Sequence, residues 1–131
     1  MLFDLGIVNN SSVVSIKFRL LPLYLLLLFF VIMISAGSVP GQAIHLSAHF
    51  GDKLLHFLAY SLMSILSFHS ITGSRIVRTI FSLLLITSLG LIDEGIQYFL
   101  PYRNASLTDW CFDIAAAVIV TFLLCLRHSE S

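Results

Sequence analysis

Four long apolar runs occupy most of this 131-residue chain and limit the folds that are open to it. The runs extend over residues 20–39, 54–71, 76–100 and 107–126, and stretches rich in Pro, Gly, Ser and Asn separate them. A helix of about 20 apolar residues crosses the hydrocarbon core of a bilayer. None of the runs has the alternating pattern of a barrel strand. The sequence therefore predicts an all-α fold, namely an integral membrane four-helix bundle with short loops.

Composition supports this prediction and excludes other classes of protein. The chain is 58% apolar and only 11% charged, and its mean hydropathy of +0.99 is far from that of a soluble domain. A formal net charge of zero argues against a nucleic-acid partner. We expect one transmembrane domain over residues 20–126, an N-terminal tail over residues 1–19 that is frayed up to residue 16, and a C-terminal tail over residues 127–131.

The distribution of Lys and Arg predicts how the chain crosses the membrane. With four spans, the two tails and the loop between the second and third runs share one face, which holds five Lys and Arg residues against two on the other. The positive-inside rule then makes both termini cytoplasmic. The first run also resembles a secretory signal peptide, because Lys17 and Arg19 precede it and small residues end it. Its length of about 20 residues favours a retained span.

Acidic residues mark a candidate site in this apolar chain. Five of the seven lie beside or inside the runs: Asp52, Asp93, Glu94, Asp109 and Asp113. Charges in a bilayer are costly and usually functional. The helix between Arg78 and Asp93 is about 21 Å long, so Asp93 reaches the outer part of a hydrocarbon core about 30 Å thick. Asp52 and Asp109 open the second and fourth runs at the same outer level.

Helical phase brings these residues together. Each run carries its polar residues on one face: Asp52, His56 and Tyr60 on the second run, Asp93, Glu94 and Gln97 on the third, and Asp109 and Asp113 on the fourth. Residues four apart point in nearly the same direction on a helix. Burial of these faces from lipid requires them to converge. The sequence therefore predicts a small polar pocket that opens on the outer face.

The same residues form three strings with a recognisable order: Asp52-Lys53-x-x-His56, Glu94-x-x-Gln97-x-Phe99-x-Pro101-x-Arg103 and Asp109-x-x-x-Asp113. Over about residues 50–126 the chain resembles the VanZ-like family, named after a small membrane protein associated with teicoplanin resistance. The first run carries none of the motifs. The resemblance implies a protein of the bacterial cytoplasmic membrane, concerned with glycopeptide susceptibility or with cell-wall precursors, and it implies no specific catalytic mechanism.

Three positions depart from the family pattern. Asp113 stands where Asn is usual, and Ala116 and Tyr102 stand where Gly is usual. Asp113 adds a potential negative charge to the site, and Ala116 would hold neighbouring helices slightly further apart than Gly. These departures indicate a divergent branch that could bind a different ligand.

The charge balance of the predicted pocket points to a ligand. Five carboxylates against Lys53 and Arg103 leave a charge of about minus three with His56 neutral, which a low dielectric does not tolerate. Some carboxyl groups must be protonated or hydrated, or a divalent cation must bind. The favoured function is binding of a polyprenyl phosphate or a lipid-linked cell-wall precursor, with Arg103 as a two-pronged phosphate donor and Lys53 as a point charge.

Two alternatives stay open. In the first, the protein is a membrane hydrolase or phosphoryl-transfer enzyme, with His56 as base or nucleophile, oriented by an acid, and Glu94 as a second catalytic candidate. In the second, the charged residues only cap helices and hold the bundle together, and activity arises from partner proteins. Neither a metal site nor a cofactor is assigned from the sequence beyond the divalent cation. Membrane lipids are the expected partners, and a homo-oligomer remains an option because four spans are few for a transporter.

Overall fold

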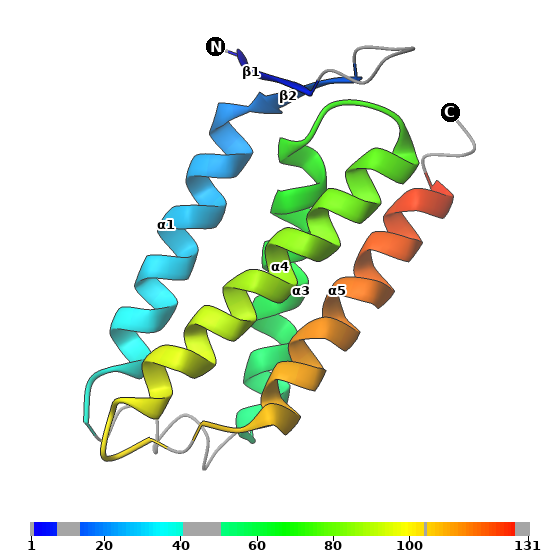
Figure 1. The fold of residues 1–131 in the computed structure, drawn as a ribbon. Helices are drawn as coiled ribbons and strands as arrows, with labels where there is room; N and C mark the ends of the chain where they lie inside the picture. Colours follow the sequence, from blue (N-terminus) through cyan, green and yellow to red (C-terminus); the bar gives the residue numbers. More distant parts are fainter. Residues whose placement is uncertain (1, 8–13, 41–50, 104, 128–131) are drawn as a thin grey trace.

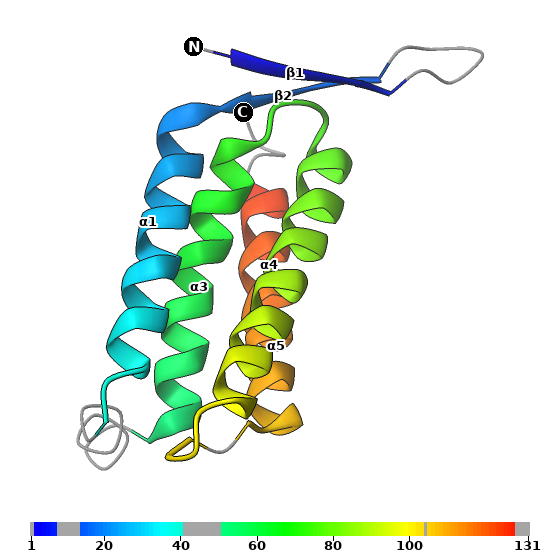
Figure 2. The same ribbon diagram turned by 60° about the vertical axis from the view of Figure 1, so that its left-hand side comes forward.

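The computed structural model describes residues 2–7, 14–40, 51–103 and 105–127. Four helices alternate in direction and form a bundle (Figures 1 and 2): α1 (Leu20–Gly37), α3 (Asp52–Ser70), α4 (Arg75–Tyr98) and α5 (Leu107–Arg127). Each helix agrees with its predicted run within two residues at either end. The predicted all-α four-helix bundle is confirmed.

α3 lies at the centre of the bundle. It packs against α1, α4 and α5, and α4 also packs against α5 (Figure 2). The buried apolar cluster that forms the core comes from all four helices: Leu26, Phe30, Tyr60, Met63, Ile86, Leu89, Ala116 and Ala117. α1 is attached mainly through α3, and Leu26 and Phe30 are the buried side chains among its 18 residues. Most of the surface of α1 therefore faces away from the bundle.

Among the helices in the described part of the chain, α1, α4 and α5 are long and apolar enough to cross a membrane by length and composition. Large apolar side chains stand exposed on their outer faces, for example Leu21 on α1 and Leu84 on α4. α3, the fourth predicted span, is not among them, and it carries Asp52, Lys53, two His and several Ser among its 19 residues. Ser64 and Ser67 are fully buried there, where small side chains let neighbouring helices approach closely. The chain is a helical membrane protein.

The N-terminal segment is a β-hairpin, and the prediction of a frayed tail is wrong for the strands. β1 (Leu2–Ile7) pairs antiparallel with β2 (Val14–Arg19), with Leu2 opposite Arg19 and Ile7 opposite Val14. The sequence of β2 alternates apolar and polar residues, which is the period of a strand. This alternation predicts a strand, whereas the polar residues 9–12 led to the prediction of a tail. Residues 9–12 lie outside the described part of the chain. Phe18 also bridges to Ile71 and joins the hairpin to the α3–α4 connection.

The two ends of the bundle carry different residues. The hairpin end consists of β1, β2, the connection of residues 71–74 and the end of α5 (Figures 1 and 2). Ser74 caps α4 there, because its Oγ accepts a hydrogen bond from the Val77 N–H at 3.3 Å. The opposite end, which we call the pocket end, consists of Ser38, the start of α3 and residues 99–107 without 104.

Candidate functional site

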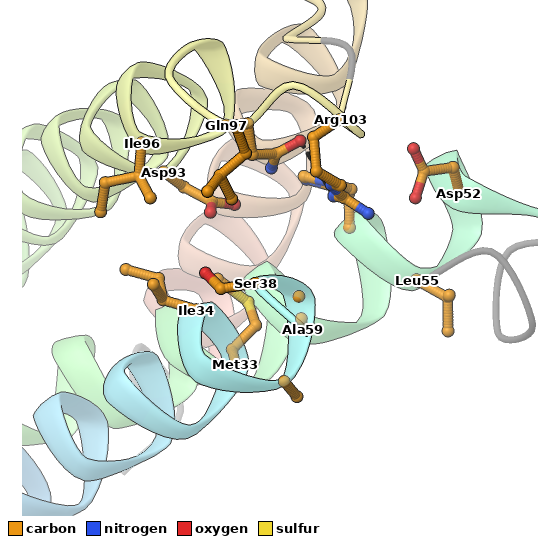
Figure 3. Close-up of a pocket in the computed structure, with 14 residues that line it drawn as sticks. Met33, Ile34, Ser38, Asp52, Leu55, Ala59, Asp93, Ile96, Gln97 and Arg103 are labelled. Atoms are coloured by element: carbon orange, nitrogen blue, oxygen red, sulfur yellow. Dashed lines mark hydrogen bonds between the residues drawn. The ribbon is translucent and has the colours of Figure 1, made fainter. Parts of the chain in front are cut away.

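A cavity of about 210 Å³ lies at the pocket end, between α1, α3, α4 and the loop that follows α4 (Figure 3). Half of the predicted site residues line it: Asp52, His56, Asp93, Gln97 and Arg103. They come from α3, from α4 and from the loop that directly follows α4. The cavity therefore depends on how the helices pack and not on any one motif.

The cavity has an apolar wall and a polar end. Met33 and Ile34 of α1 and Ala59 of α3 face Ile96 of α4 across it (Figure 3). The guanidinium of Arg103 lies on the side of Asp52, away from Ile34 and Ile96 (Figure 3). A lining of this kind suits a ligand that joins an apolar part to a charged part.

The polar face of α3 is buried in the bundle. His56 and Tyr60 are 7% and 0% exposed, and their rings stack at a centroid distance of 6.0 Å. The two residues are four apart on the helix, which places them one above the other. The Tyr60 hydroxyl donates a hydrogen bond of 3.4 Å to Asp93 Oδ2 on α4. This long contact joins α3 to α4 beside the cavity, which Asp93 lines.

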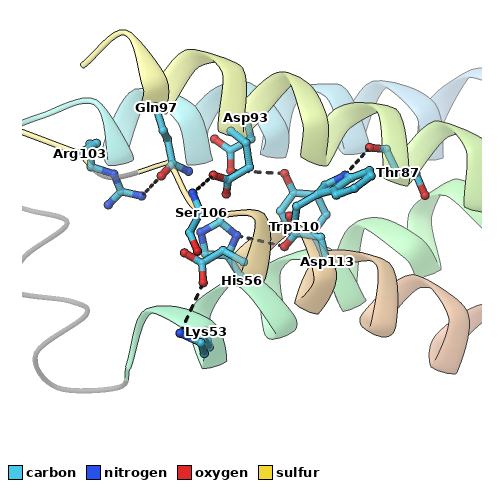
Figure 4. Close-up of polar contacts among 12 residues, drawn as sticks. Lys53, His56, Thr87, Asp93, Gln97, Arg103, Ser106, Trp110 and Asp113 are labelled. Atoms are coloured by element: carbon cyan, nitrogen blue, oxygen red, sulfur yellow. Dashed lines mark hydrogen bonds and ion pairs between the residues drawn. The ribbon is translucent and has the colours of Figure 1, made fainter. Parts of the chain in front are cut away.

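His56 is paired with a fully buried acid. Its Nδ1 lies 3.0 Å from Oδ1 of Asp113, which is 0% exposed on α5 (Figure 4). An ionised Asp113 favours the tautomer with the proton on Nδ1, which leaves Nε2 available to a ligand or a proton. The second oxygen, Asp113 Oδ2, has no hydrogen-bond partner among the described residues.

Gly90 lets α4 and α5 approach closely beside Asp113. A Cβ atom at Gly90 would lie 3.0 Å from both Asp113 Oδ2 and Trp110 Cδ1. Trp110 then donates from Nε1 to the carbonyl oxygen of Thr87 at 3.1 Å (Figure 4). Trp110 therefore joins α5 to α4.

Glu94 is held by the start of α5. Its Oε2 accepts a hydrogen bond of 2.7 Å from the backbone N–H of Ser106, which directly precedes that helix. A carboxylate at this position is also favoured by the positive end of the helix dipole. Oε1 of Glu94, which is 6% exposed overall, has no hydrogen-bond partner among the described residues. Oε2 of Glu94 thus anchors the start of α5, whereas Oε1 makes no such contact with the described residues.

The two cations of the site lie toward its rim. Lys53 Nζ is 3.9 Å from Asp109 Oδ1, but the Lys53 side chain is 55% exposed, so this ion pair is weak. Arg103 donates from NH2 to Gln97 Oε1 at 2.9 Å (Figure 4). Within the described part of the chain Arg103 forms no ion pair with a carboxylate. Its remaining donors are available to a ligand.

The structure thus gathers all ten predicted site residues at the pocket end. Five line the cavity, Tyr60 binds Asp93, Asp113 binds His56, and Lys53, Glu94 and Asp109 lie around them. The sequence did not reveal the α1 wall, because that helix is uniformly apolar and carries no polar marker. Gly90 was also missed, although a Gly one turn before Glu94 in an apolar helix is a signal of close packing.

Tyr102 and Ala116, two of the positions that differ from the VanZ-like pattern, both make contacts in the structure. The Tyr102 hydroxyl donates to the carbonyl oxygen of Ser38 and so joins the loop after α4 to the end of α1. Ala116, the second departure, is fully buried in the core. A glycine at either position would lack the contact that the side chain makes here.

The site is rich in buried acids. Asp93, Glu94, Asp109 and Asp113 are each at most 6% exposed, and His56 is the buried group that can balance them. Among the described residues, two sets of three side chains have ligand atoms within 4.8 Å of one another and could hold a metal ion: Asp52, His56 and Asp109, or His56, Glu94 and Asp113. The arrangement can therefore bind a cation, orient an imidazole, or do both.

Comparisons with protein-family models, with curated proteins and with solved structures give no match for this chain. The resemblance to the VanZ-like family stays a prediction.

Proposed function

We propose that this protein binds the phosphate-bearing head group of a long-chain lipid, such as a polyprenyl phosphate or a lipid-linked cell-wall precursor. The observation that supports this most is the two-part lining of the cavity, in which Met33, Ile34 and Ile96 form an apolar wall and Arg103 stands at a polar end. A free phosphate ion has no apolar part that could contact this wall, whereas a lipid phosphate has one.

Arg103 is the group expected to contact the phosphate. A guanidinium offers a planar fork of donors that matches two phosphate oxygens, whereas an ammonium offers a point charge. Gln97 holds one arm of the fork at 2.9 Å and so limits the rotamers of Arg103 before the ligand arrives. Lys53, exposed at the rim, adds attraction over a longer range.

The lipid chain would leave the cavity between α1 and α4. α1 packs mainly against α3, so the side chains on its cavity face are only partly covered. Because α1 and α4 are both apolar enough to lie in a bilayer, an opening between them would face acyl chains. This supports a lipid that enters sideways from the membrane.

Arg103→Lys is expected to weaken binding of a polyprenyl phosphate by at least about tenfold, because Lys keeps the charge but loses the fork. The matched control is Arg75→Lys, which makes the same change at an exposed site at the hairpin end. Binding is measured by titrating the lipid into detergent-solubilised protein and following Trp110 fluorescence. Equal affinities for wild type and Arg103→Lys would contradict the proposal and favour a purely structural or partner-binding role.

The proposed setting is the bacterial cytoplasmic membrane, with both termini in the cytoplasm and the pocket end outside. Five Lys and Arg residues against two support this orientation. The VanZ-like resemblance adds a role in glycopeptide susceptibility, teicoplanin included. An outward pocket would meet the head groups of precursors on the side of the membrane where cell wall is assembled.

The orientation is tested with paired reporters. Alkaline phosphatase, which is active only outside the cytoplasm, should be active when inserted at residues 101–106 and inactive when fused at the C-terminus. Green fluorescent protein should give the reverse pattern. If both reporters indicated a cytoplasmic pocket end, contact with outward-facing precursors would be ruled out.

A second function, hydrolysis or phosphoryl transfer on the same lipid, is supported by one observation. Asp113 holds His56 at 3.0 Å, which is the pairing of an orienting acid with a catalytic base or nucleophile. Phosphate release from a polyprenyl diphosphate by the wild type, absent in His56→Gln, would decide in favour of the enzyme. Binding without turnover would decide for the lipid-binding protein.

A further inference from the structure

We propose that His56, Glu94 and Asp113 together bind a divalent transition-metal ion, of which Zn²⁺ and Mn²⁺ are the probes. One ligand atom from each side chain lies within 4.8 Å of the others, and the three come from α3, α4 and α5. An ion at this position would join three helices of the bundle. The inference rests on these side chains alone and does not depend on the lipid.

The proposed set contains two buried carboxylate oxygens that no described residue satisfies. Glu94 Oε1 and Asp113 Oδ2 are both buried and lack hydrogen-bond partners among the described residues. Their side chains are 6% and 0% exposed, so water compensates neither oxygen fully. An unsatisfied buried carboxylate oxygen is costly, and a metal ion is one of the few partners that removes the cost.

The other oxygen of each acid already has a partner. Glu94 Oε2 accepts from the Ser106 N–H at 2.7 Å, and Asp113 Oδ1 lies 3.0 Å from His56 Nδ1. The bond to Ser106 orients Glu94. An ion bound by both His56 Nδ1 and Asp113 would take the place of the proton between Nδ1 and Oδ1, and the 3.0 Å between these two atoms is close to the separation of two ligands on such an ion.

The spacing and the donor types fit a transition metal. Ligands at about 2.1 Å from a tetrahedral ion lie about 3.4 Å apart. The three side chains would have to move together by no more than about 1.4 Å, which small rotamer changes provide. An imidazole with two carboxylates suits Zn²⁺ or Mn²⁺ better than Ca²⁺ or Mg²⁺, which prefer oxygen ligands only.

The other set, Asp52, His56 and Asp109, is the weaker candidate. Asp52 is only partly buried, and Asp109 Oδ1 already lies 3.9 Å from the ammonium of Lys53. A nearby positive charge disfavours a metal ion at that oxygen. His56 belongs to both sets, so an ion can use its imidazole in only one of them. We assign the ion to the set with Glu94 and Asp113, because all three of its residues are buried.

An ion with three protein ligands keeps an open coordination position. His56 lines the cavity as well as belonging to this set, so that position would adjoin the cavity. A phosphate oxygen of a bound head group could fill it. The ion would then offset the excess of buried carboxylates that opposes an anionic ligand.

The test measures metal in purified protein without added lipid. The protein is purified with a tag that contains no histidine, and metal is quantified by mass spectrometry of the acid-digested sample. After chelation, Zn²⁺ and Mn²⁺ are titrated while thermal unfolding is followed. We expect about one ion per chain, a higher melting temperature on addition of either Zn²⁺ or Mn²⁺, and at least about tenfold weaker binding in Glu94→Gln and in Asp113→Asn.

Asp52→Asn is the matched control, because it makes the same chemical change in the competing set. It should bind the ion as the wild type does. Loss of the ion in Asp52→Asn together with retention in Glu94→Gln would overturn the assignment. The assignment would also be overturned if the folded wild-type protein carried no ion and neither Zn²⁺ nor Mn²⁺ stabilised it. This second result requires no variant. Because no lipid is present, either outcome leaves the test of Arg103 unaffected.

Discussion

Replacing His56 with alanine is expected to destabilise the bundle by about 3–5 kcal/mol, since it leaves a buried acid without its partner. Asp113 is fully buried, its Oδ2 has no hydrogen-bond partner among the described residues, and the substitution removes the partner of Oδ1 as well. The measurement is the free energy of unfolding in mixed detergent micelles, with a chelator present so that metal binding does not contribute.

A double-mutant cycle provides the control. Asp113→Ala removes the acid, and the variant that lacks both His56 and Asp113 leaves no buried charge uncompensated. The double variant should therefore be less destabilised than the sum of the two single changes, with a coupling energy of at least about 1 kcal/mol. Additive effects would contradict a direct interaction between the two side chains.

Gly90→Leu should destabilise the protein by about 1–3 kcal/mol, and by more if α4 and α5 cannot separate. Even a Cβ atom at this position would lie 3.0 Å from Asp113 Oδ2 and from Trp110 Cδ1. The added side chain must push Asp113 away from its present place, so metal binding should be lost at the same time. Thermal unfolding and metal content of the same preparation measure both effects.

Gly95→Leu is the matched control on the same helix. A Cβ atom at Gly95 meets no atom within 4 Å among the described residues, and the position is exposed. Because Gly costs about 1 kcal/mol relative to good helix formers, this substitution should be neutral or stabilising. Equal destabilisation by the two substitutions would mean that close packing at Gly90 is not what positions Asp113.

The helices could be predicted from the sequence because their signals are local. A run of about 20 apolar residues that ends at a Gly, Pro or Ser cluster specifies a membrane helix almost without tertiary information. α3 was found in this way even though its inward face is polar, because the apolar residues on its outer side keep the run continuous. The hairpin was missed because a polar stretch between two short strands is equally typical of a tail.

The polar face of each helix could also be predicted, since spacing of three or four residues places side chains together. However, the sequence could not predict which of these residues pair with one another. The sequence gives no reason for His56 to bind Asp113 and not Asp109, or for Arg103 to bind Gln97 and not a carboxylate. Those choices depend on the rotation and depth of neighbouring helices, which close contacts such as that at Gly90 determine.

The cavity itself lies beyond what helical periodicity can predict. Its apolar wall belongs to Met33 and Ile34, whose helix has no polar face. That wall exists because α1 packs on α3 and leaves a space beside α4. A purely structural cluster of charges would require neither the wall nor Arg103 at its end.

Native mass spectrometry of the wild-type protein, released from detergent after gentle purification, tests the lipid-binding proposal most directly. We predict a mass that corresponds to the chain with one phosphate-bearing lipid, and loss of that lipid in Arg103→Lys but not in Arg75→Lys. The bare polypeptide mass, or bulk membrane lipids that bind equally to the wild type and to Arg103→Lys, would contradict the account.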